Sequence, residues 1–442
     1  FMLIERLREL LVRGVGLDEA VRQVRAASMF TTHTPVAAGH DVFFADQLAA
    51  CAGPLWDEMG IGREAFMRLG RHPQAQGESF HMTAAAIRLS RRVNGVAQSH
   101  GVVTRRIWAS LWPGRSETEN PIRHVTNGVH LATWMAHAIM SVLDAHFGEG
   151  WDLRVDDPAM WDDVLHLSDT NLWQAHLQLK RTLLTLVREE ARRAFAQRSR
   201  EALQLVGSGV LLAPEALTIG FARRFATYKR ASLLFHDVER LLRIITNPAR
   251  PVQIVFAGKA HPADTPGKQM LQEVYQTTRD PRFEGRIAFV VDYDLHMAHV
   301  LVQGVDVWMN LPRVPMEACG TSGMKAALNG VPQLSTRDGW WAEGFNGENG
   351  WAIPTAGTES ESAEADAAAA NALYDLLERE VVPAFYTRDA RDLPHRWLLM
   401  MKHAMRAAGS RFTARRMLVD YVRDYYVPAI LGNSGPDTPP TA

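Results

Sequence analysis

A carboxylate and an amine at the two ends of a run of small residues are the groups best suited to chemistry. Glu317 opens the stretch EACGTSGMK and Lys325 closes it. The stretch follows the apolar residues 305–309 and leads into Ala-Ala-Leu, which predicts a turn between a strand and a helix. The converging N–H groups of such a turn suit an anion, and a lysine just inside the helix can be desolvated and made reactive. The alternative interpretation of this stretch is an ordinary helix-capping turn with a lysine on the surface.

Four cations follow another strand-like run, residues 217–221. They lie in the segment ARRFATYKR and are Arg223, Arg224, Lys229 and Arg230. Arginine offers a two-pronged donor and lysine a point charge, so a basic cluster at the end of a strand is typical of a phosphate site. The alternative is a solvated basic surface, which is common in proteins.

Strand-like and helical segments alternate through the middle of the chain. This alternation predicts an α/β fold with a parallel sheet and helices on both faces. Ligands bind such sheets beyond the carboxyl ends of the strands, where both segments described above are expected. Nearer the start, residues 78–100 are predicted to form a helix. The predicted strands are 217–221, 252–256, 287–291 and 305–309, and the predicted helices between them are 231–245, 269–277 and 295–302.

Histidines near the start of the chain carry weaker signals. His33 lies on a loop marked by Pro35 and Gly39, where a histidine is most often a structural hydrogen-bonding group. His40 and Asp41 have no third ligand at a suitable spacing, so we expect no metal site.

Several motifs together resemble one enzyme family. The stretch EACGTSGMKAALNG resembles the pyridoxal-phosphate lysine motif of the glycogen and α-glucan phosphorylases, with Cys319 where that motif usually has serine. TTHTPVAAGHD, NGVA, TNGVH, ARRFATYKR and GKAHP resemble further segments of the same family. The resemblance extends from about Leu3 to Ala429, and it is greatest to the shorter bacterial and archaeal branch.

The resemblance implies roles toward a cofactor and a phosphate. Lys325 would form the Schiff base with pyridoxal 5′-phosphate, and Arg223 would contact the cofactor phosphate at a position where the family commonly has lysine. Arg224 and Lys229 would clamp the substrate phosphate. Tyr293 would lie near the cofactor ring, although a tyrosine at the end of a strand is as often a packing residue.

The resemblance also implies contacts with a sugar. Glu317 and Asn127 would hold glucose hydroxyls, and the main-chain carbonyl of His33 would face the C1–C2 region of the glucosyl unit. The alternative for Asn127 is an ordinary Asn-Gly turn.

Small and polar residues of the same motifs would complete the site. Gly320 and Thr321 would present backbone and hydroxyl groups to the cofactor and the sugar, and Tyr228 would line the site. Cys319 would supply main-chain and side-chain contacts, but a thiol is a weaker hydrogen-bond donor than the usual serine hydroxyl.

The family fold is the two-lobed glycosyltransferase (GT-B-like) fold. The resemblance places the remainder of an N-terminal lobe at 1–126, a Rossmann-like C-terminal lobe with the lysine motif at 127–432, and a disordered tail at 433–442. We expect most of the N-terminal lobe to be absent, because the chain begins at Phe1 inside an amphipathic helical pattern. We therefore expect residues 1–442 alone to have little or no catalytic activity.

The implied reaction is that of an α-glucan phosphorylase. It transfers a terminal α-1,4-linked glucosyl unit of a glucan to inorganic phosphate and gives α-glucose 1-phosphate with retention of configuration. One alternative is a nucleotide-sugar glucosyltransferase such as a glycogen synthase, and another is an inactive glucan-binding fragment. Lys325, eight residues after Glu317, distinguishes the phosphorylase, because only that enzyme needs an amine for an aldehyde cofactor.

Length and composition agree with a large globular protein. The chain has 442 residues, enough for two or three domains, and 47% of them are hydrophobic. Its 48 Lys and Arg balance 49 Asp and Glu, so neither nucleic acid nor an acidic membrane is expected as a partner. Two cysteines give no disulfide framework, and no apolar run is long enough to span a bilayer. A cytoplasmic location follows as the default, and a homodimer is the family expectation.

Overall fold

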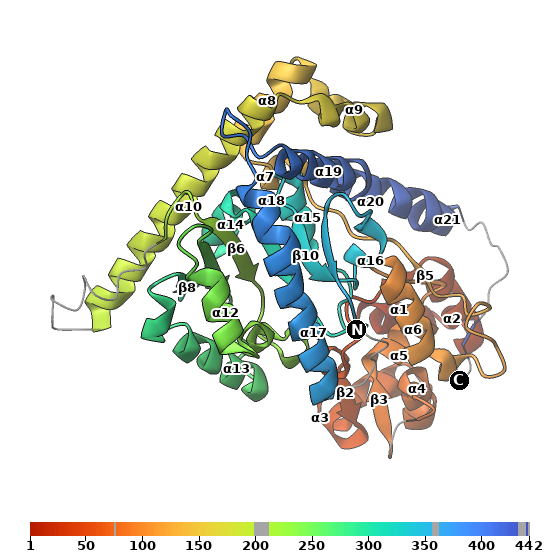
Figure 1. Ribbon diagram of the computed structural model, residues 1–442. Coiled ribbons are helices and arrows are strands. Elements are labelled where there is room, and N and C mark those ends of the chain that lie inside the picture. Colours follow the sequence, from red (N-terminus) through yellow and green to blue (C-terminus); the bar gives the residue numbers. More distant parts are fainter. Residues whose placement is uncertain (75–76, 199–211, 356–361, 432–438, 441–442) are drawn as a thin grey trace. The chain divides into compact units, whose positions relative to one another are not determined.

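The chain packs as two compact units. The computed structural model describes residues 1–74, 77–198, 212–355, 362–431 and 439–440 (Figure 1). Unit 1 comprises Phe1–Asn127, Pro315–Cys319 and Arg416–Ala442, and unit 2 comprises Gly128–Val314 and Gly320–Arg415.

This division differs from a single boundary near residue 127. The loop Pro315–Cys319 and the segment that begins at Arg416 pack with unit 1, although the sequence places both in the second lobe. Of the predicted tail 433–442, only residues 439–440 are among those that the structure describes.

Unit 2 is built on a six-stranded parallel sheet, which confirms the predicted α/β fold (Figure 1). The strand order is β11-β10-β9-β6-β7-β8. The chain runs outward from β6 to β8, returns to the other side of β6, and runs outward again from β9 to β11. This is a Rossmann-type order, and its switch point lies between β6 and β9. The strands are β6 (Leu217–Ala222), β7 (Val252–Ala257), β8 (Ile287–Val290), β9 (Val307–Asn310), β10 (Gln333–Thr336) and β11 (Gly350–Ile353).

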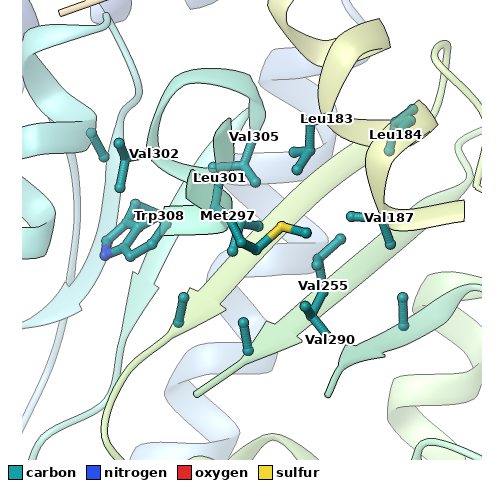
Figure 2. Packing of buried hydrophobic residues seen from close by; sticks show 14 of the residues in the cluster. Leu183, Leu184, Val187, Val255, Val290, Met297, Leu301, Val302, Val305 and Trp308 are labelled. Atoms are coloured by element: carbon teal, nitrogen blue, oxygen red, sulfur yellow. The ribbon is translucent and has the colours of Figure 1, made fainter. Parts of the chain in front are cut away.

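Both faces of this sheet are covered, which is why its central strands are continuous apolar runs. Val255 of β7 shares one buried cluster with Leu183 of α10 and Leu301 of α14 (Figure 2). The next residue, Phe256, points to the opposite face, where its ring stacks on Phe235 with 5.6 Å between centroids.

Among the described residues, none of the helices combines the length and the hydropathy that a membrane span requires. The helices of unit 2 are α7 (Leu131–Trp134), α8 (His137–Phe147), α9 (Pro158–Asp163), α10 (Asp169–Arg198), α12 (Val238–Ile245), α13 (Thr265–Thr277), α14 (Leu295–Gly304), α15 (Thr321–Leu328), α16 (Trp341–Gly344), α17 (Ala363–Leu376), α18 (Val382–Tyr386) and α19 (His395–Arg411).

A buried carboxylate joins β6, β9 and α10. Asp306, just before β9, is fully buried, and its Oδ2 accepts hydrogen bonds from Lys180 Nζ at 2.5 Å and from the Thr218 backbone N–H at 2.7 Å. Its Oδ1 lies 2.7 Å from His176 Nε2. Burial alone would raise the pKa of Asp306, but Lys180 and His176 bring it below its usual range. The charges are therefore compensated at the switch point of the sheet.

Replacing Lys180 by methionine should strongly destabilise unit 2. The change leaves the Asp306 carboxylate buried without its amine, and removing one partner of a buried ion pair costs about 3–5 kcal/mol. Urea unfolding followed by circular dichroism measures the free energy of unfolding. Lys268→Met, at an exposed position of α13, is the matched control and should change that free energy by at most about 0.5 kcal/mol. Equal effects of the two substitutions would show that the ion pair between Lys180 and Asp306 adds no stability.

Unit 1 contains a three-stranded parallel sheet of order β1-β4-β5 and a two-stranded antiparallel pair, β2-β3. The last helical segment of the chain packs against the three-stranded sheet. Asn94 Nδ2 of β4 donates to the Tyr421 hydroxyl at 3.0 Å, and Arg416 donates to the Thr126 carbonyl at 2.8 Å. The elements are α1 (Met2–Val12), α2 (Leu17–Ala26), β1 (Met29–Thr31), β2 (Val42–Phe44), α3 (Ala45–Glu58), α4 (Gly62–Gly70), β3 (Ser79–His81), α5 (Met82–Arg88), β4 (Arg92–Gly95), α6 (Gln98–Ile107), β5 (Arg123–His124), α20 (Ala414–Tyr421), a π-helical turn (Val422–Tyr426) and α21 (Val427–Ile430).

The predicted helix at 78–100 is wrong. Only α5 and the first residues of α6 are helical there, and β3 and β4 occupy much of the remainder. Val93 lies in β4, where it pairs with Phe30 of β1. The partner of this strand is far away in the sequence, so the local apolar spacing that fits a helix does not reveal it.

Candidate active site

Two of the predicted segments follow adjacent strands of unit 2. The basic segment begins directly after β6, and the lysine motif enters α15 after β9. β6 and β9 are parallel neighbours, with Gly220 paired to Trp308. Their carboxyl ends therefore open at one edge of the sheet, at its switch point, which is where ligands bind in such folds.

The amine of Lys325 lies over an aromatic face. Its Nζ is 3.6 Å from the centroid of the Trp134 ring, and the lysine is half-buried. Burial lowers the pKa of Lys325 below that of an ordinary lysine. A larger fraction of this amine is therefore unprotonated near neutral pH, as attack on an aldehyde requires.

A buried amide holds the lysine helix against α7. Asn329 is fully buried, and its Nδ2 donates to the carbonyls of Trp134 at 2.8 Å and Lys325 at 2.9 Å. Its Oδ1 accepts from the Ala136 backbone N–H at 2.7 Å. One side chain thus fixes the indole and the lysine relative to each other.

The helix that carries Lys325 starts at a residue in the left-handed region. Gly320 has φ 84° and ψ 55° and caps α15, whose first residue is Thr321. Glycine adopts this conformation without strain. The turn starts α15 after the loop that follows β9, and the free N–H groups of a helix start suit an anion.

The basic segment divides into buried and exposed cations. Arg223 and Lys229 are each 7% exposed, whereas Arg224 is exposed. Lys229 Nζ lies 4.8 Å from the ring centroid of Tyr228, at the distance of a cation–π contact. The segment is therefore not a uniformly solvated surface.

A glycine of the next strand end allows Arg223 to take its position. The Arg223 backbone N–H donates to the Ala257 carbonyl at 3.2 Å. A Cβ added to Gly258 would lie 1.9 Å from the Arg223 carbonyl oxygen, and the φ of Gly258 is 145°. The GKAHP motif thus positions the basic segment by close packing of the backbone.

A second arginine ties the two strand-end segments together. Arg230 Nε donates to the Leu311 carbonyl at 2.8 Å, and one of its terminal nitrogens donates to the Pro312 carbonyl at 3.2 Å. Its other terminal nitrogen pairs with Asp366 of α17 at 2.9 Å, and Arg313 pairs with the same carboxylate at 2.8 Å. The segments after β6 and β9 are therefore held in one frame.

Tyr293 lies farther along the same edge. It follows β8, which is separated from β9 by β6 and β7. Its side chain is half-buried against the same apolar cluster as Trp134, and burial raises its pKa above the usual range. The packing alternative for Tyr293 thus has direct support, and its predicted place near a cofactor ring stays a prediction.

The remaining predicted residues belong to unit 1. His33 follows β1 and is exposed, and Asn127 follows β5, where its backbone N–H donates to the Val96 carbonyl at 3.0 Å. Glu317 and Cys319 are both buried, at 8% and 4% exposed. His33 and Asn127 therefore follow the carboxyl ends of the outer strands of the three-stranded sheet.

Sequence reasoning missed the residues that support Lys325 and the basic segment. Trp134 and Asn329 lie within or beside motifs singled out for other residues, and Asp366 lies in a helix with no chemical signal. The spacing of Asn329, four residues after Lys325, places both on one face of a helix and could have drawn attention to the pair. Among the described residues, no group of three or more His, Cys, Asp or Glu side chains is arranged to hold a metal ion.

Comparison with known proteins decides the family. A family model described as carbohydrate phosphorylase matches residues 61–349. This chain belongs to the carbohydrate phosphorylase family. A glycogen phosphorylase of Aquifex aeolicus is 41% identical over 426 residues, covering 96% of this chain and 61% of the relative. A maltodextrin phosphorylase of Thermococcus litoralis is 41% identical, covering 97% of this chain and 50% of the relative.

A third relative matches this chain to a similar extent. A glycogen phosphorylase of Mycobacterium bovis is 41% identical over 439 residues, covering 97% of this chain and 50% of the relative. The chain thus spans about half to three fifths of the length of these relatives. All three are named phosphorylases, so the nucleotide-sugar glucosyltransferase alternative is not favoured.

The amine of Lys325 should react with an aldehyde down to an unusually low pH. Only the unprotonated amine reacts, and a lowered pKa keeps that form populated as the pH falls. Reductive methylation with formaldehyde and dimethylamine borane, followed by peptide mapping over a pH series, measures the reactive fraction. In the folded chain its midpoint should lie below about 10.4, the ordinary value for lysine.

The same peptide from chain unfolded in guanidinium chloride is the internal control. There the burial is lost, so the midpoint for Lys325 should move to the ordinary value. Coinciding profiles for folded and unfolded chain would contradict the desolvated amine.

Proposed function

We propose that this chain carries the cofactor lobe of an α-glucan phosphorylase. The reaction transfers a terminal α-1,4-linked glucosyl unit to inorganic phosphate and gives α-glucose 1-phosphate with retention. The observation that supports it most strongly is the desolvated Lys325 amine at the switch point of the sheet, beside buried cations on the neighbouring strand end. Membership of the carbohydrate phosphorylase family supports the same activity.

The residues present fit pyridoxal 5′-phosphate. Its aldehyde needs a partly unprotonated amine, which Lys325 offers, and its phosphate needs a cation, which the buried Arg223 offers on the segment after the neighbouring strand. Gly320 and Thr321 would contribute backbone and hydroxyl groups at that helix start. When bound, the cofactor supplies a phosphate group that exchanges a proton with the substrate phosphate.

The chain's own residues would bind the substrates. Arg224, which is exposed, and Lys229 would hold inorganic phosphate so that its proton can pass to the leaving glycosidic oxygen. Glu317 and Asn127 would hold glucose hydroxyls, and the His33 carbonyl would stabilise positive charge at C1 of the glucosyl unit.

Tyr228, whose ring contacts Lys229, and the buried Cys319 would also line the substrate site. Tyr293 would lie near the cofactor ring. We also propose an α-1,4-glucan as the substrate partner, a homodimer as the assembly and the cytoplasm as the location.

Borohydride reduction should fix pyridoxal 5′-phosphate on Lys325. The chain is incubated with the cofactor, reduced, digested and mapped by mass spectrometry. Label should be confined to the peptide that contains Lys325 and should be lost in Lys325→Arg, which keeps the positive charge. Lys259→Arg, at a nearby exposed lysine, is the matched control and should retain the label. Label on another lysine of a loaded chain would defeat the assignment.

Catalysis is tested in a chimera. The matching segment of this chain replaces the 426-residue aligned segment of the Aquifex aeolicus glycogen phosphorylase. The chimera should form glucose 1-phosphate from maltodextrin and phosphate. Arg224→Ala in the chimera should weaken apparent phosphate affinity about 10–100-fold, because a hydrogen bond to a charged group contributes about 1.5–3 kcal/mol. Apparent maltodextrin affinity should change little.

Arg243→Ala, an exposed position of α12, is the matched control and should leave both affinities unchanged. Glucan elongation from UDP-glucose without phosphate would instead identify a nucleotide-sugar glucosyltransferase. A folded, cofactor-loaded chimera with unaltered phosphate use after Arg224→Ala would show that this arginine is a solvated surface residue.

A further inference from the structure

A basic pocket lies within unit 1, at the amino ends of two strands of its sheet. Its volume is about 390 Å³, and it lies where β4 and β5 begin, beside the helical segment that follows α20. Ligand sites of parallel sheets usually lie at the carboxyl ends of the strands. The motifs discussed above follow carboxyl ends, so none of them accounts for this pocket.

Four arginines line the pocket with a single acidic residue. Arg91 and Arg92 come from the start of β4, Arg123 from the start of β5, and Arg423 and Asp424 from the helical segment. The formal charge of these five side chains is therefore +3. A pocket of this charge attracts a multivalent anion, and guanidinium groups match the oxygen geometry of phosphate.

The arginine on β5 has spare hydrogen-bonding capacity. Within the part of the chain that the structure describes, the Arg123 side chain makes no hydrogen bond and no ion pair. Arg423 is different, because it pairs with Asp424 and with Asp420, each at 2.8 Å. The acidic residue of the pocket is thus engaged by Arg423, and Arg123 remains available to a ligand.

A buried phenol supplies the second, independent sign of a ligand. Tyr425 lines the pocket, is 3% exposed, and packs with Val125 and Tyr421 in a small apolar cluster. Its hydroxyl is buried and has no hydrogen-bond partner among the described residues. Burial raises its pKa, so the group stays a neutral donor. An unsatisfied buried donor is rare in folded proteins and calls for an acceptor.

We propose that this pocket binds a phosphate group, either as inorganic phosphate or as a phosphate monoester. Arg92 and Arg123 would bind the charged oxygens, and the Tyr425 hydroxyl would donate to one of them. A volume of about 390 Å³ is within the range of small-molecule sites. The inference stands apart from the proposed catalytic function, since none of the residues that line this pocket is assigned to that function.

Calorimetric titration of the full chain tests the proposal. Arg224→Ala and Lys229→Ala are introduced first, so that the cations proposed for the substrate phosphate are absent. Inorganic phosphate and glycerol 1-phosphate are the two probes. The background chain should bind at least one of them, and Arg123→Gln should weaken that binding at least tenfold. Arg13→Gln replaces an exposed arginine of unit 1 outside the pocket. It is the matched control and should leave the affinity for the probe unchanged.

Tyr425→Phe separates binding from folding. Because the hydroxyl has no hydrogen-bond partner among the described residues, its removal should leave the thermal midpoint unchanged or raise it, yet weaken binding of the probe several-fold. Binding of inorganic phosphate and the monoester alike indicates recognition of the phosphate group alone, and binding of the monoester only indicates an organic phosphate ligand. Absence of binding to the folded background chain, or binding that survives both Arg123→Gln and Tyr425→Phe, would overturn the proposal.

Discussion

The carboxylate of Asp306 determines how unit 2 is assembled. It lies at the amino end of the β6–β9 pair, where the strand order reverses, and accepts hydrogen bonds from the Thr218 N–H of β6 and from Lys180 of α10. A slip of one residue between β6 and β9 would turn every side chain of β9 to the other face and would break these bonds. The same network fixes α10 to the amino ends of β6 and β9.

Short-range contacts fix the backbone of the segments that follow β6 and β9. Asn329 holds the lysine helix to the Trp134 carbonyl, Arg230 holds the basic segment to the loop after β9, and Gly258 lets Arg223 approach. Burial of Lys325 disfavours its charged form, whereas the Trp134 face favours it. Burial lowers the pKa of Lys325, and Asn329 holds the helix that carries the amine in place.

Residue pattern predicted the parallel sheet of unit 2 but only part of its extent. β6 and β7 are continuous apolar runs and are readily found, whereas β10 carries Gln333 and Thr336 and was not predicted. The strand β4 was mistaken for helix because its partner, β1, is distant in sequence. Composition drew attention to the lysine and basic segments, but only the resemblance to the phosphorylases gave their residues roles. Trp134 was not found, because only the fold brings its ring beneath Lys325.

The Asp306 network also has a consequence for the order of events during synthesis. Lys180 precedes Asp306 by 126 residues, so a ribosome working at about 5–20 residues per second takes about 6–25 s to make the second partner after the first. Throughout that interval the lysine has no carboxylate to enter the core with and stays hydrated. A nascent chain that has completed β6, β7 and β8 therefore holds three strands of the sheet but lacks the carboxylate that compensates Lys180 of α10. Burial of Lys180 with its charge compensated therefore requires the return of the chain to β9, although several apolar partners of Leu183 and Leu184 are made earlier.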